Sequence, residues 1–400
     1  MKSKNLFCIL ALLLMANAQA DDKNVMMFNQ DVSNYTATHT DAQMNREGLL
    51  TYLDSVIAGG KVTHFLININ CQVAAYDSKV MSPMWYRIND PAFKQLDWVR
   101  RTHMMHTNGI DYAKVWIDGC RAKNVAPWLS IRMNDVHCVN DRQDPTTSEF
   151  WCKHPEFWRV PNSSCKNWLD GAFDYTHPEV RTYFLNFLRE ALTRYDVDGI
   201  ECDWMRFTEH LPPGRQRECS WALNEFMRET RKIVNEISAK RGHPIEIAAR
   251  VASTPKAMFA YGTDALAWAK DGSVDWVIPC NFFSSVDFDM PYAEWKRIIA
   301  EANPKVKVLP GMDAGVLVKD AETGNCSRRL LKIEEYCGFA DRMFTQGADG
   351  IYLFNLFTYF EAAYNNDDRK PWKFILSKGL SPASIKDVTK SIPANWCRER

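Results

Sequence analysis

The sequence has no excess of charge of either sign, because its 400 residues include 49 Lys or Arg and 49 Asp or Glu. Proteins that bind nucleic acid carry a basic surplus for the phosphates, so we predict no nucleic-acid partner. No apolar run beyond residue 20 is long enough to span a bilayer, so we predict no membrane partner. Hydrophobic residues make up 46% and charged residues 24%, which is typical of a globular chain and excludes a disordered one.

Several motifs of cofactor chemistry are also missing. There is no C-x-x-C pair and no H-E-x-x-H, so neither a zinc ribbon nor a zincin-type metalloprotease is supported. A G-x-G-x-x-G loop is missing as well, which argues against a dinucleotide-binding doubly wound sheet. We predict no cofactor and no metal ion, with a calcium ion held by Asp135 and Asp141 as a less favoured alternative to solvated loop acids.

The first twenty residues are typical of a secretory signal peptide. Lys2 and Lys4 precede an apolar run from Leu6 to Met15, and Ala18-Gln19-Ala20 follows as a small-residue cleavage site. The apolar run is too short to cross a membrane. We therefore predict a signal peptide over residues 1–20 and an exported domain, periplasmic or extracellular, over residues 21–400.

Cysteine is abundant, with 12 residues, of which Cys8 lies in the predicted signal peptide. The remaining 11 are an odd number, so in an oxidising compartment some pair and at least one stays free. The candidates for local bridges lie close in sequence: Cys138, Cys152 and Cys165 in one polar stretch, and Cys326 with Cys337. Cys202 and Cys280 lie in apolar strand patterns and are expected to be buried thiols.

Short apolar runs alternate with longer stretches of helical periodicity, such as Pro178 to Tyr195 and Arg215 to Lys240, which is typical of β-α units. Eight runs predict strands, at Val25 to Asn29, Thr63 to Asn70, Ala126 to Met133, Gly199 to Phe207, Ile245 to Val251, Val274 to Phe283, Val306 to Pro310 and Gly350 to Phe354. No Pro-, Gly- or Ser-rich linker divides them, so we predict an α/β fold, a single (β/α)8 TIM barrel, with a doubly wound sheet as the alternative. A long loop, roughly Asp135 to Tyr175, is expected after strand three.

Polar residues end nearly every predicted strand. In a (β/α)8 barrel the functional groups stand at the carboxyl ends of the strands and in the loops that follow. The candidates for contact with a substrate are Asn68, Asn70, Arg132, Asn134, His137, Trp204, Arg206, Arg250, Asn281, Asp287, Asp289 and Asn355. Each alone fits a solvated loop residue, but together they are expected to converge on one cavity.

Strand four carries two carboxylates on one face. Side chains alternate across a strand, so Glu201 and Asp203 point into the barrel, with Asp203 nearer the mouth. One interpretation is a structural ion pair between a buried acid and an inward arginine such as Arg250 or Arg132. The other is catalysis, which we favour for Asp203 because catalytic groups stand at the mouth.

Carboxylates at a barrel mouth suit glycoside hydrolysis, which needs one carboxyl group to protonate the leaving oxygen and another to attack carbon or activate water. The loop after strand three adds Trp151, Trp158 and Trp168, whose indole faces either stack on sugar rings or fill a core. Two alternatives stay open, a carbohydrate-binding barrel without catalysis and a polysaccharide lyase with His137 as its base.

Four stretches carry a resemblance to a known family: SIRMNDVH from Ser130, YDVDGIECDWMRF from Tyr195, DFDMPYAEWK from Asp287 and GADGIYLFNLF from Gly347. They are similar to exported bacterial barrel proteins called glycoside-hydrolase-like, or family-10 glycosylhydrolase-like, over nearly the whole mature chain. The group also looks related to endo-fucanases, which cut sulfated fucans. The resemblance implies a (β/α)8 barrel that acts on the glycosidic bonds of a polysaccharide.

The same resemblance implies a set of site residues. The positions that it implies for catalysis and the pocket are Asp203, Arg132, Asn134, His137 and Arg206. The chain departs from the family at strand seven, where LPGMDAG has Asp313 in place of an expected Glu. Glu201, one pleat deeper, is expected only to support catalysis. The partner of Asp203 is therefore open among Glu246, Asp287, Asp289 and Asp313.

A sulfated or uronic polymer would need its anionic groups bound at the mouth. The candidates for that contact, through charge-assisted hydrogen bonds, are Arg132, Arg206, Arg250 and His137. The sequence therefore predicts an exported glycoside hydrolase that cleaves a polysaccharide with a carboxylate pair, in a retaining reaction, on a neutral or an anionic polymer.

Overall fold

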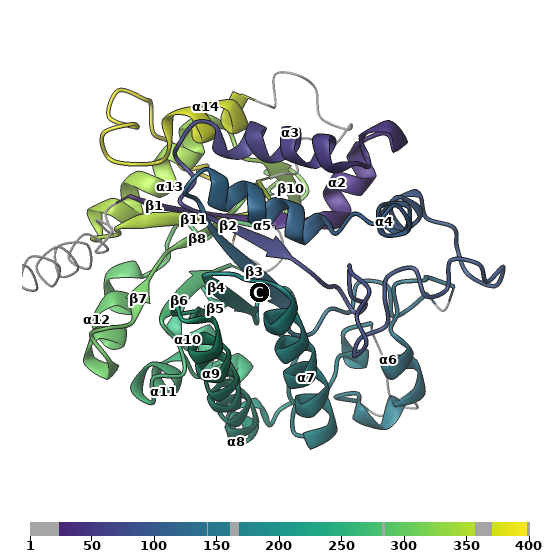
Figure 1. The fold of residues 1–400 in the computed structure, drawn as a ribbon. Helices are drawn as coiled ribbons and strands as arrows, with labels where there is room; N and C mark the ends of the chain where they lie inside the picture. The colour runs from purple at the N-terminus through teal and green to yellow at the C-terminus, as the bar shows by residue number, and fades with distance from the viewer. Residues whose placement is uncertain (1–23, 142, 161–167, 282–284, 357–369, 398–400) are drawn as a thin grey trace, which may run out of the picture.

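A computed structural model describes residues 24–141, 143–160, 168–281, 285–356 and 370–397 (Figure 1). The predicted signal peptide, residues 1–20, lies outside these ranges. Strands form a curled sheet at the centre of the molecule, and helices cover its outside (Figure 1). The predicted (β/α)8 TIM-barrel fold is confirmed.

The central strands form one sheet in the order β7-β6-β5-β4-β3-β2-β1-β11-β8, with parallel pairing throughout. Their bounds are β1 Val25–Asp31, β2 His64–Asn68, β3 Ala126–Arg132, β4 Gly199–Asp203, β5 Glu246–Ala252, β6 Trp276–Cys280, β7 Lys307–Val308, β8 Gly311–Asp313 and β11 Gly350–Phe354. Because parallel strands share a direction, all carboxyl ends lie at one edge of the sheet, where polar side chains meet.

The seventh strand of the barrel is broken in two. β7 pairs with β6, and β8 pairs with β11. The residues between them bond to both neighbours, because Leu309 N–H donates to Val277 O (3.0 Å) and Pro310 O accepts from Tyr352 N–H (2.9 Å). Pro310 has no N–H to donate, so regular pairing stops there while the chain closes the ring. The strand predicted from Val306 to Pro310 is therefore too short at its carboxyl end.

Helices connect successive strands and pack around the ring (Figure 1). Their bounds are α2 Val32–Thr38, α3 Arg46–Ile57, α4 Asp97–Thr107, α5 Tyr112–Ala122, α6 Glu149–Lys153, α7 Pro178–Arg194, α8 Gln216–Cys219, α9 Trp221–Arg241, α10 Pro255–Tyr261, α11 Ala265–Lys270, α12 Tyr292–Ala302, α13 Ile333–Thr345 and α14 Lys370–Lys378. The helix predicted from Pro178 to Tyr195 matches α7. The one predicted from Arg215 to Lys240 is divided into α8 and α9 at Ser220.

The ends of α7 and α9 follow from local chemistry. α7 begins at Pro178, whose fixed φ and missing N–H suit the first helical turn. α9 ends at Gly242, which adopts the left-handed conformation (φ 79°) that other residues rarely enter. Each helix buries one apolar stripe, which includes Phe184 in α7 and Phe226 in α9. The two helices pack beside each other against the outside of the ring.

Two apolar layers hold the barrel together. The larger lies between the outer face of the strands and the helices, and includes Trp204 and Trp268. A smaller cluster fills the ring, where Trp128 and Trp276 meet edge to face at 6.5 Å. Gly199 makes room for this packing, because a Cβ at that position would lie 2.2 Å from the Trp128 indole. Polar side chains follow this cluster toward the carboxyl ends of the strands.

Two segments extend the regular β-α plan at the carboxyl end of the ring. Residues 133–177, between β3 and α7, hold α6 and the short 3-10 turns η2 Pro155–Phe157 and η4 Trp168–Gly171. Trp151 and Trp158 are buried there and stack on each other at 4.2 Å, so they fill a core. The side chain of Trp168 lies outside the described part. A hairpin of β9 Gly315–Lys319 and β10 Cys326–Leu330 follows β8.

The local disulfides predicted from the sequence are wrong for the described cysteines. The free thiols include Cys138, Cys152, Cys326 and Cys337. Cys326 is exposed on the hairpin, whereas Cys337 is buried in α13, so the two sulfur atoms face different surroundings. Cys165 lies outside the described residues. Cys202 and Cys280 are buried, as predicted.

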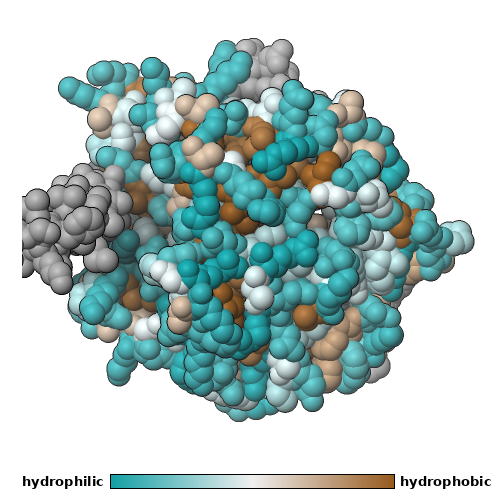
Figure 2. Space-filling model, viewed as in Figure 1, coloured by the Kyte–Doolittle hydropathy of each residue, from teal (hydrophilic) through white to brown (hydrophobic). Residues whose placement is uncertain are grey.

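The surface is largely hydrophilic on the face drawn in Figure 2, with apolar side chains gathered between α3 and α5. Those two helices pack against each other, so the apolar atoms belong to their contact. Among the helices that the structure describes, none combines the length and the apolar character that a membrane crossing needs.

Candidate functional site

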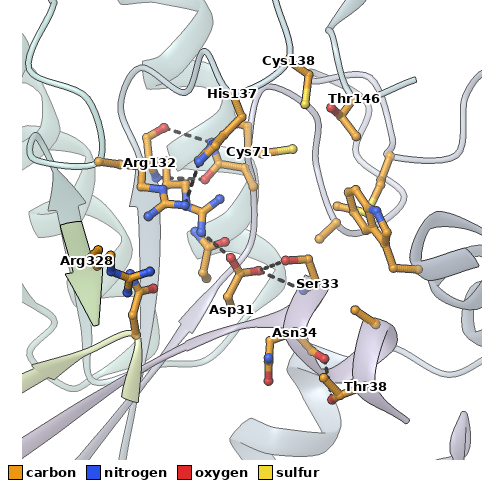
Figure 3. Close-up of a pocket in the computed structure, with 18 residues that line it drawn as sticks. Asp31, Ser33, Asn34, Thr38, Cys71, Arg132, His137, Cys138, Thr146 and Arg328 are labelled. Carbon is orange, nitrogen blue, oxygen red and sulfur yellow. Dashed lines mark hydrogen bonds and ion pairs between the residues drawn. The ribbon is translucent and has the colours of Figure 1, made fainter. Parts of the chain in front are cut away.

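A cavity of about 460 Å³ opens at the carboxyl ends of the strands (Figure 3). Its walls come from the helices α2 and α4, the ends of β1, β2 and β3, and the segments after β2, β3 and β4. The hairpin strand β10 and Asn355, which follows β11, complete the described lining. In Figure 3, Arg328 and Thr146 approach the cavity from opposite sides. The substrate-contact candidates that line it are Asn68, Asn70, Arg132, His137, Arg206 and Asn355.

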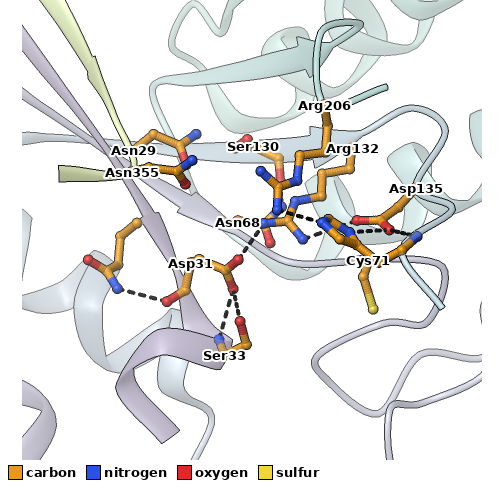
Figure 4. Close-up of polar contacts among 12 residues, drawn as sticks. Asn29, Asp31, Ser33, Asn68, Cys71, Ser130, Arg132, Asp135, Arg206 and Asn355 are labelled. Atoms are coloured by element: carbon orange, nitrogen blue, oxygen red, sulfur yellow. Dashed lines mark hydrogen bonds and ion pairs between the residues drawn. The ribbon is translucent and has the colours of Figure 1, made fainter. Parts of the chain in front are cut away.

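Arg132 is the centre of an ion-pair network on the cavity wall (Figure 4). Its Nη2 donates to Asp31 Oδ2, and its Nη1 donates to Asp135 Oδ2 at 3.1 Å. Asp135 Oδ1 lies 2.7 Å from His137 Nδ1, and His137 Nε2 lies 2.8 Å from Arg206 Nη2. Because a guanidinium can only donate, this contact makes Nε2 the acceptor and directs the Nδ1 proton to Asp135.

The charges in this network set its protonation states. Burial alone would raise the pKa of Asp31, but the Arg132 guanidinium and hydrogen bonds from Ser33 outweigh it and hold that pKa below its usual value. Burial also acts to raise the pKa of Asp135, and there His137 and Arg132 lower it by more. Burial and the nearby Arg132 lower the pKa of Arg206 to about 10. Near neutral pH both acids are therefore anions, and Arg206 is a cation.

Asp203 ends β4 at the mouth, but its carboxylate is enclosed. Arg250 Nε donates to Oδ1 at 2.9 Å and Nη2 donates to Oδ2 at 2.8 Å, and both side chains are 1% exposed. Oδ1 also accepts the backbone N–H groups of Met205 and Arg206, both at 2.9 Å. Asp203 is not among the described residues that line the cavity. The ion pair fits the structural interpretation of this residue, while its place at the strand end fits the catalytic one.

Glu201 lies one pleat below Asp203 inside the ring. Its Oε1 accepts hydrogen bonds from Asn29 Nδ2 (3.1 Å) and Ser130 Oγ (2.7 Å), and neither donor is charged. Burial and the Asp203 carboxylate raise the pKa of Glu201 to about 7. Glu201 is therefore a proton-carrying group directly beneath Asp203.

We expect Glu201→Gln to change how stability depends on pH. The pKa of Glu201 is about 7 in the folded protein against a reference of 4.5. Below pH 4.5 Glu201 is protonated in the folded and in the unfolded state. Between pH 4.5 and pH 7 it loses its proton only in the unfolded chain, so the free energy of unfolding of the wild type falls by about 3 kcal/mol as the pH rises. The neutral amide removes this loss, so the variant should be more stable than the wild type at pH 8 and similar at pH 4.

Urea unfolding at both pH values measures the difference. Asn29 Nδ2 and Ser130 Oγ can both donate to the Gln oxygen, so the substitution keeps these contacts. A variant with the same pH dependence as the wild type would contradict the assignment of a buried, proton-carrying Glu201.

Asp313 is the last residue of β8 and lies close to the cavity. Its Oδ2 accepts from Asn355 Nδ2 at 2.8 Å, and its Oδ1 accepts from Gly315 N–H at 3.2 Å and lies 3.4 Å from Arg328 Nη2. Burial raises the pKa of Asp313 despite these contacts. Asn355 and Arg328 both line the cavity, so Asp313 stands directly behind its wall. A carboxyl group with a raised pKa beside a cavity has the properties of a proton donor.

Two of the predicted contact residues bridge neighbouring strands. Asn70 bonds to both backbone groups of Arg132, accepting from its N–H and donating to its carbonyl oxygen, each at 3.0 Å. Asn68 Nδ2 donates to Ser130 O at 3.3 Å. These amides line the cavity and also fix the positions of the strand ends that form its floor.

Other candidates are buried away from the cavity. Trp204 points out of the ring and packs on Trp268, with ring centroids 5.9 Å apart. Asn134 Nδ2 donates to Phe173 O (2.8 Å) and Glu209 O (2.7 Å), so it joins the loops after β3 and β4. Asn281 Nδ2 donates to Ser285 Oγ at 2.8 Å.

The remaining acidic candidates are also separated from the cavity. Glu246 begins β5, so it lies at the opposite end of the ring, 3.9 Å from Lys307 Nζ. Asp287 is buried and accepts from Ser253 Oγ at 2.6 Å. Asp289 is half exposed and pairs with Arg342 at 2.6 Å. Of the acidic candidates, the structure therefore places Asp203 and Asp313 at the carboxyl ends of their strands, with Glu201 one pleat below Asp203, and separates Glu246, Asp287 and Asp289 from the cavity.

Several cavity residues were not assigned a role from the sequence. Among the described residues, Asp31 is the carboxylate that lines the cavity directly, and its position at a strand end was the available signal. Trp98 on α4 and Arg328 on β10 had no such signal, because they reach the cavity through elements outside the barrel strands. Among the described residues there is no cluster of three or more His, Cys, Asp or Glu side chains that could hold a metal ion.

Comparisons with known proteins give matches in structure alone. No protein-family model and no curated protein sequence matches the chain. An α-L-fucosidase isoenzyme 2 from Paenibacillus thiaminolyticus is 12% identical over 91% of this chain, with a TM-score of 0.52. The chain spans about half of that fucosidase, 49% of its length.

Two further solved structures are covered almost completely. The PgaB (BpsB) glycoside hydrolase domain from Bordetella bronchiseptica is 11% identical over 89% of this chain and 98% of its own, with a TM-score of 0.50. A group IV chitinase from Ostrinia furnacalis is 11% identical over 91% of this chain and 100% of its own, with a TM-score of 0.50. At these identities the likeness shows the fold, so the chain shares a TIM-barrel-like fold with glycoside hydrolases.

Proposed function

We propose that the protein is a glycoside hydrolase that cleaves a polysaccharide with a pair of carboxyl groups. The observation that carries the proposal is the contrast between two acids at the barrel mouth. Asp203 is held by a guanidinium in a bidentate ion pair, whereas burial raises the pKa of Asp313. Acids in environments that differ in this way divide the roles of nucleophile and proton donor in glycoside hydrolysis.

The proposed reaction retains configuration at the anomeric carbon. An oxygen of Asp203 forms a bond to that carbon while the bond to the leaving oxygen breaks, and Asp313 gives its proton to the leaving oxygen. Water then attacks the glycosyl-enzyme, Asp313 takes the proton from that water, and the Asp203 carboxylate is released. Asp203 does not line the cavity, so this route requires the side chains between Asp203 and the cavity to move when substrate binds.

The substrate is proposed to be an extracellular or periplasmic polymer, neutral or bearing sulfate or carboxylate groups. The signal-like segment over residues 1–20 supports export. The positively charged groups on the cavity wall support an anionic polymer. Of the arginines predicted for this contact, Arg132 and Arg206 line the cavity, whereas Arg250 is occupied by Asp203.

Release of reducing ends from a panel of plant, algal and bacterial polysaccharides tests the proposal. A proton NMR time course of the first product then reports retention or inversion. Products that absorb as unsaturated uronates would instead identify a lyase that uses His137 as its base. Binding to a polymer without any product would identify a carbohydrate-binding barrel.

Asp313→Asn is expected to slow the reaction according to the leaving group. On the natural linkage, loss of the proton donor should lower kcat by about 10²–10⁴-fold, the usual contribution of a general acid. An aryl glycoside with a nitrophenolate leaving group needs no proton, so its cleavage should change little. Asp118→Asn, an exposed partner of Lys114, is the matched control. Equal losses on both substrates would show that Asp313 is not the donor.

A further inference from the structure

The cavity has two kinds of wall. Its apolar lining comes from α2, α4 and the chain between β2 and α4, and the residues are Ala37, Ala75, Met84 and Trp98. Its positively charged lining comes from β3, the loop after β4 and β10, and the residues are Arg132, Arg206 and Arg328. The helices α2 and α4 pack together, so the apolar residues that they supply belong to one side.

Arg206 has no carboxylate within ion-pair distance among the described residues. Its Nη2 donates to His137, and its Nε is buried with no hydrogen-bond partner in the described chain. A guanidinium has five N–H donors, and a buried donor left without an acceptor is destabilising. Because Arg206 lines the cavity and stays charged at neutral pH, an anion in the cavity would be attracted to its guanidinium.

Arg328 brings a further guanidinium to the same cavity. It is carried by the hairpin that follows β8, an addition to the regular β-α plan. Its side chain is 35% exposed, and its Nη2 lies 3.4 Å from Asp313 Oδ1, longer than a close ion pair. The hairpin therefore adds a positive charge to the cavity wall that Arg206 also lines.

Among the described residues that line the cavity, the charges do not balance. Three guanidinium groups stand there against one carboxylate, Asp31, which is bonded to Arg132. Asp135 stands behind Arg132, and Asp313 stands behind Arg328. Within this described lining, Arg206 is the guanidinium that has no carboxylate at ion-pair distance.

We propose that the cavity, as part of the hydrolase site proposed above and resting on that function, binds one acidic sugar residue. The apolar face of the ring packs on the Trp98 indole, and its carboxylate or sulfate accepts hydrogen bonds from Arg206 and Arg328. Indoles offer flat apolar surfaces, and guanidinium forks match the oxygens of both anions. A volume of about 460 Å³ lies within the range of pockets that hold small molecules.

Calorimetric titration of the whole protein with monosaccharides tests the proposal. The probes are the methyl glycosides of glucuronic and galacturonic acid, the 6-sulfates of glucose and galactose, and methyl glucoside and methyl galactoside. We expect an acidic sugar to bind at least about tenfold more tightly than its neutral counterpart, the effect of one charge-assisted hydrogen bond. The preferred acid distinguishes carboxylate from sulfate. Equal binding of neutral and acidic sugars, or no binding of any acidic sugar, overturns the proposal.

Variants test the contributions of the positively charged wall and the apolar wall one at a time. Arg206→Gln and Arg328→Gln should weaken binding of the acidic sugar by at least about tenfold and binding of its neutral counterpart by much less. Trp98→Ala should weaken acidic and neutral sugars alike, by about tenfold. Arg206→Lys keeps the charge without the fork and should retain part of the preference. Loss of acidic and neutral binding in the same proportion in Arg206→Gln, with the fold intact, would also overturn the proposal.

Matched controls and folding checks complete the experiment. Arg342→Gln changes an arginine paired with Asp289 away from the cavity, and Trp221→Ala changes an indole that is 48% exposed on α9. Both should bind the sugars as the wild type does, and circular dichroism verifies that every variant is folded. Monosaccharide binding needs no bond cleavage. If the protein cleaves a polymer but does not prefer acidic monosaccharides, only the assignment of the cavity is wrong. If the protein binds acidic sugars but cleaves no polymer, the cavity assignment stands and the proposed hydrolase function is wrong.

Discussion

Asp203→Asn should lower turnover by a factor on the order of 10⁴ or more, the scale seen when a reacting group is removed. The same substitution should lower the free energy of unfolding by about 3 kcal/mol or more, because it leaves the Arg250 guanidinium buried against a neutral amide. The two effects come from different interpretations of one residue. The first follows if Asp203 attacks the substrate, and the second follows from the ion pair that encloses it.

A second variant separates catalysis from structure. Asp203→Asn combined with Arg250→Met removes the unpaired buried guanidinium and keeps a side-chain oxygen that can accept the N–H groups of Met205 and Arg206. We expect this double variant to regain stability and to stay inactive. Urea unfolding and reducing-end release on the cleaved polymer measure the two properties, with the surface substitution Glu236→Gln as a control. More than a few per cent of wild-type activity in folded Asp203→Asn would show that Asp203 is not a catalytic carboxylate.

The strands of the barrel could be predicted because each is a short buried run bounded by polar or turn residues. The predicted run from Gly350 to Phe354 has the same bounds as β11. The run predicted to reach Phe207 instead ends at Asp203, although Trp204 and Met205 are apolar. There Asp203 Oδ1 accepts the N–H groups of Met205 and Arg206, so a side chain replaces the neighbouring strand as their partner.

The inward positions of the site residues followed from alternation along the strands, but their partners did not. Glu201 and Asp203 point inward while Trp204 points outward, as a two-residue period requires. Both arginines lie in register with Asp203, Arg132 on β3 and Arg250 on β5. Arg250 turns to Asp203, whereas Arg132 is bonded to Asp31 and Asp135. The choice depends on these other acids, which arrive from other segments, so the sequence left Arg250 and Arg132 as equal candidates.

The parts of the site that were not predicted come from segments without a fixed period. Arg328 reaches the cavity on a hairpin whose direction depends on its packing beside β8, and Trp98 reaches it from a helix. Asn134 is polar and follows a strand, yet it turns toward the loops and holds them together. A polar residue after a strand therefore indicates the correct end of the barrel, but it does not indicate which way its side chain turns.

Arg132→Met is expected to reverse the sign of the contribution that Asp31 makes to the pH dependence of the free energy of unfolding. In the wild type, Arg132 helps to hold the pKa of Asp31 below its reference value of 3.8, so the stability from this acid is present above pH 4 and is lost as the pH falls through the folded pKa. Without the guanidinium, burial dominates and raises that pKa, so stability should fall as the pH rises above 4. At pH 7 the unpaired buried carboxylate should cost about 3–5 kcal/mol.

Urea unfolding of both proteins at pH 4.5 and pH 7 measures the two slopes. Methionine keeps much of the apolar stem of arginine, so the change acts mainly through charge. Adding Asp31→Asn to Arg132→Met should restore part of the stability at pH 7, because one of the two buried anions that lose Arg132 is then gone, while Asp135 keeps its contact with His137. Arg100→Met, in an exposed pair with Asp41, should leave stability nearly unchanged at both pH values. An Arg132→Met protein as stable as the wild type at pH 7 would mean that the network around Arg132 does not hold the strand ends together.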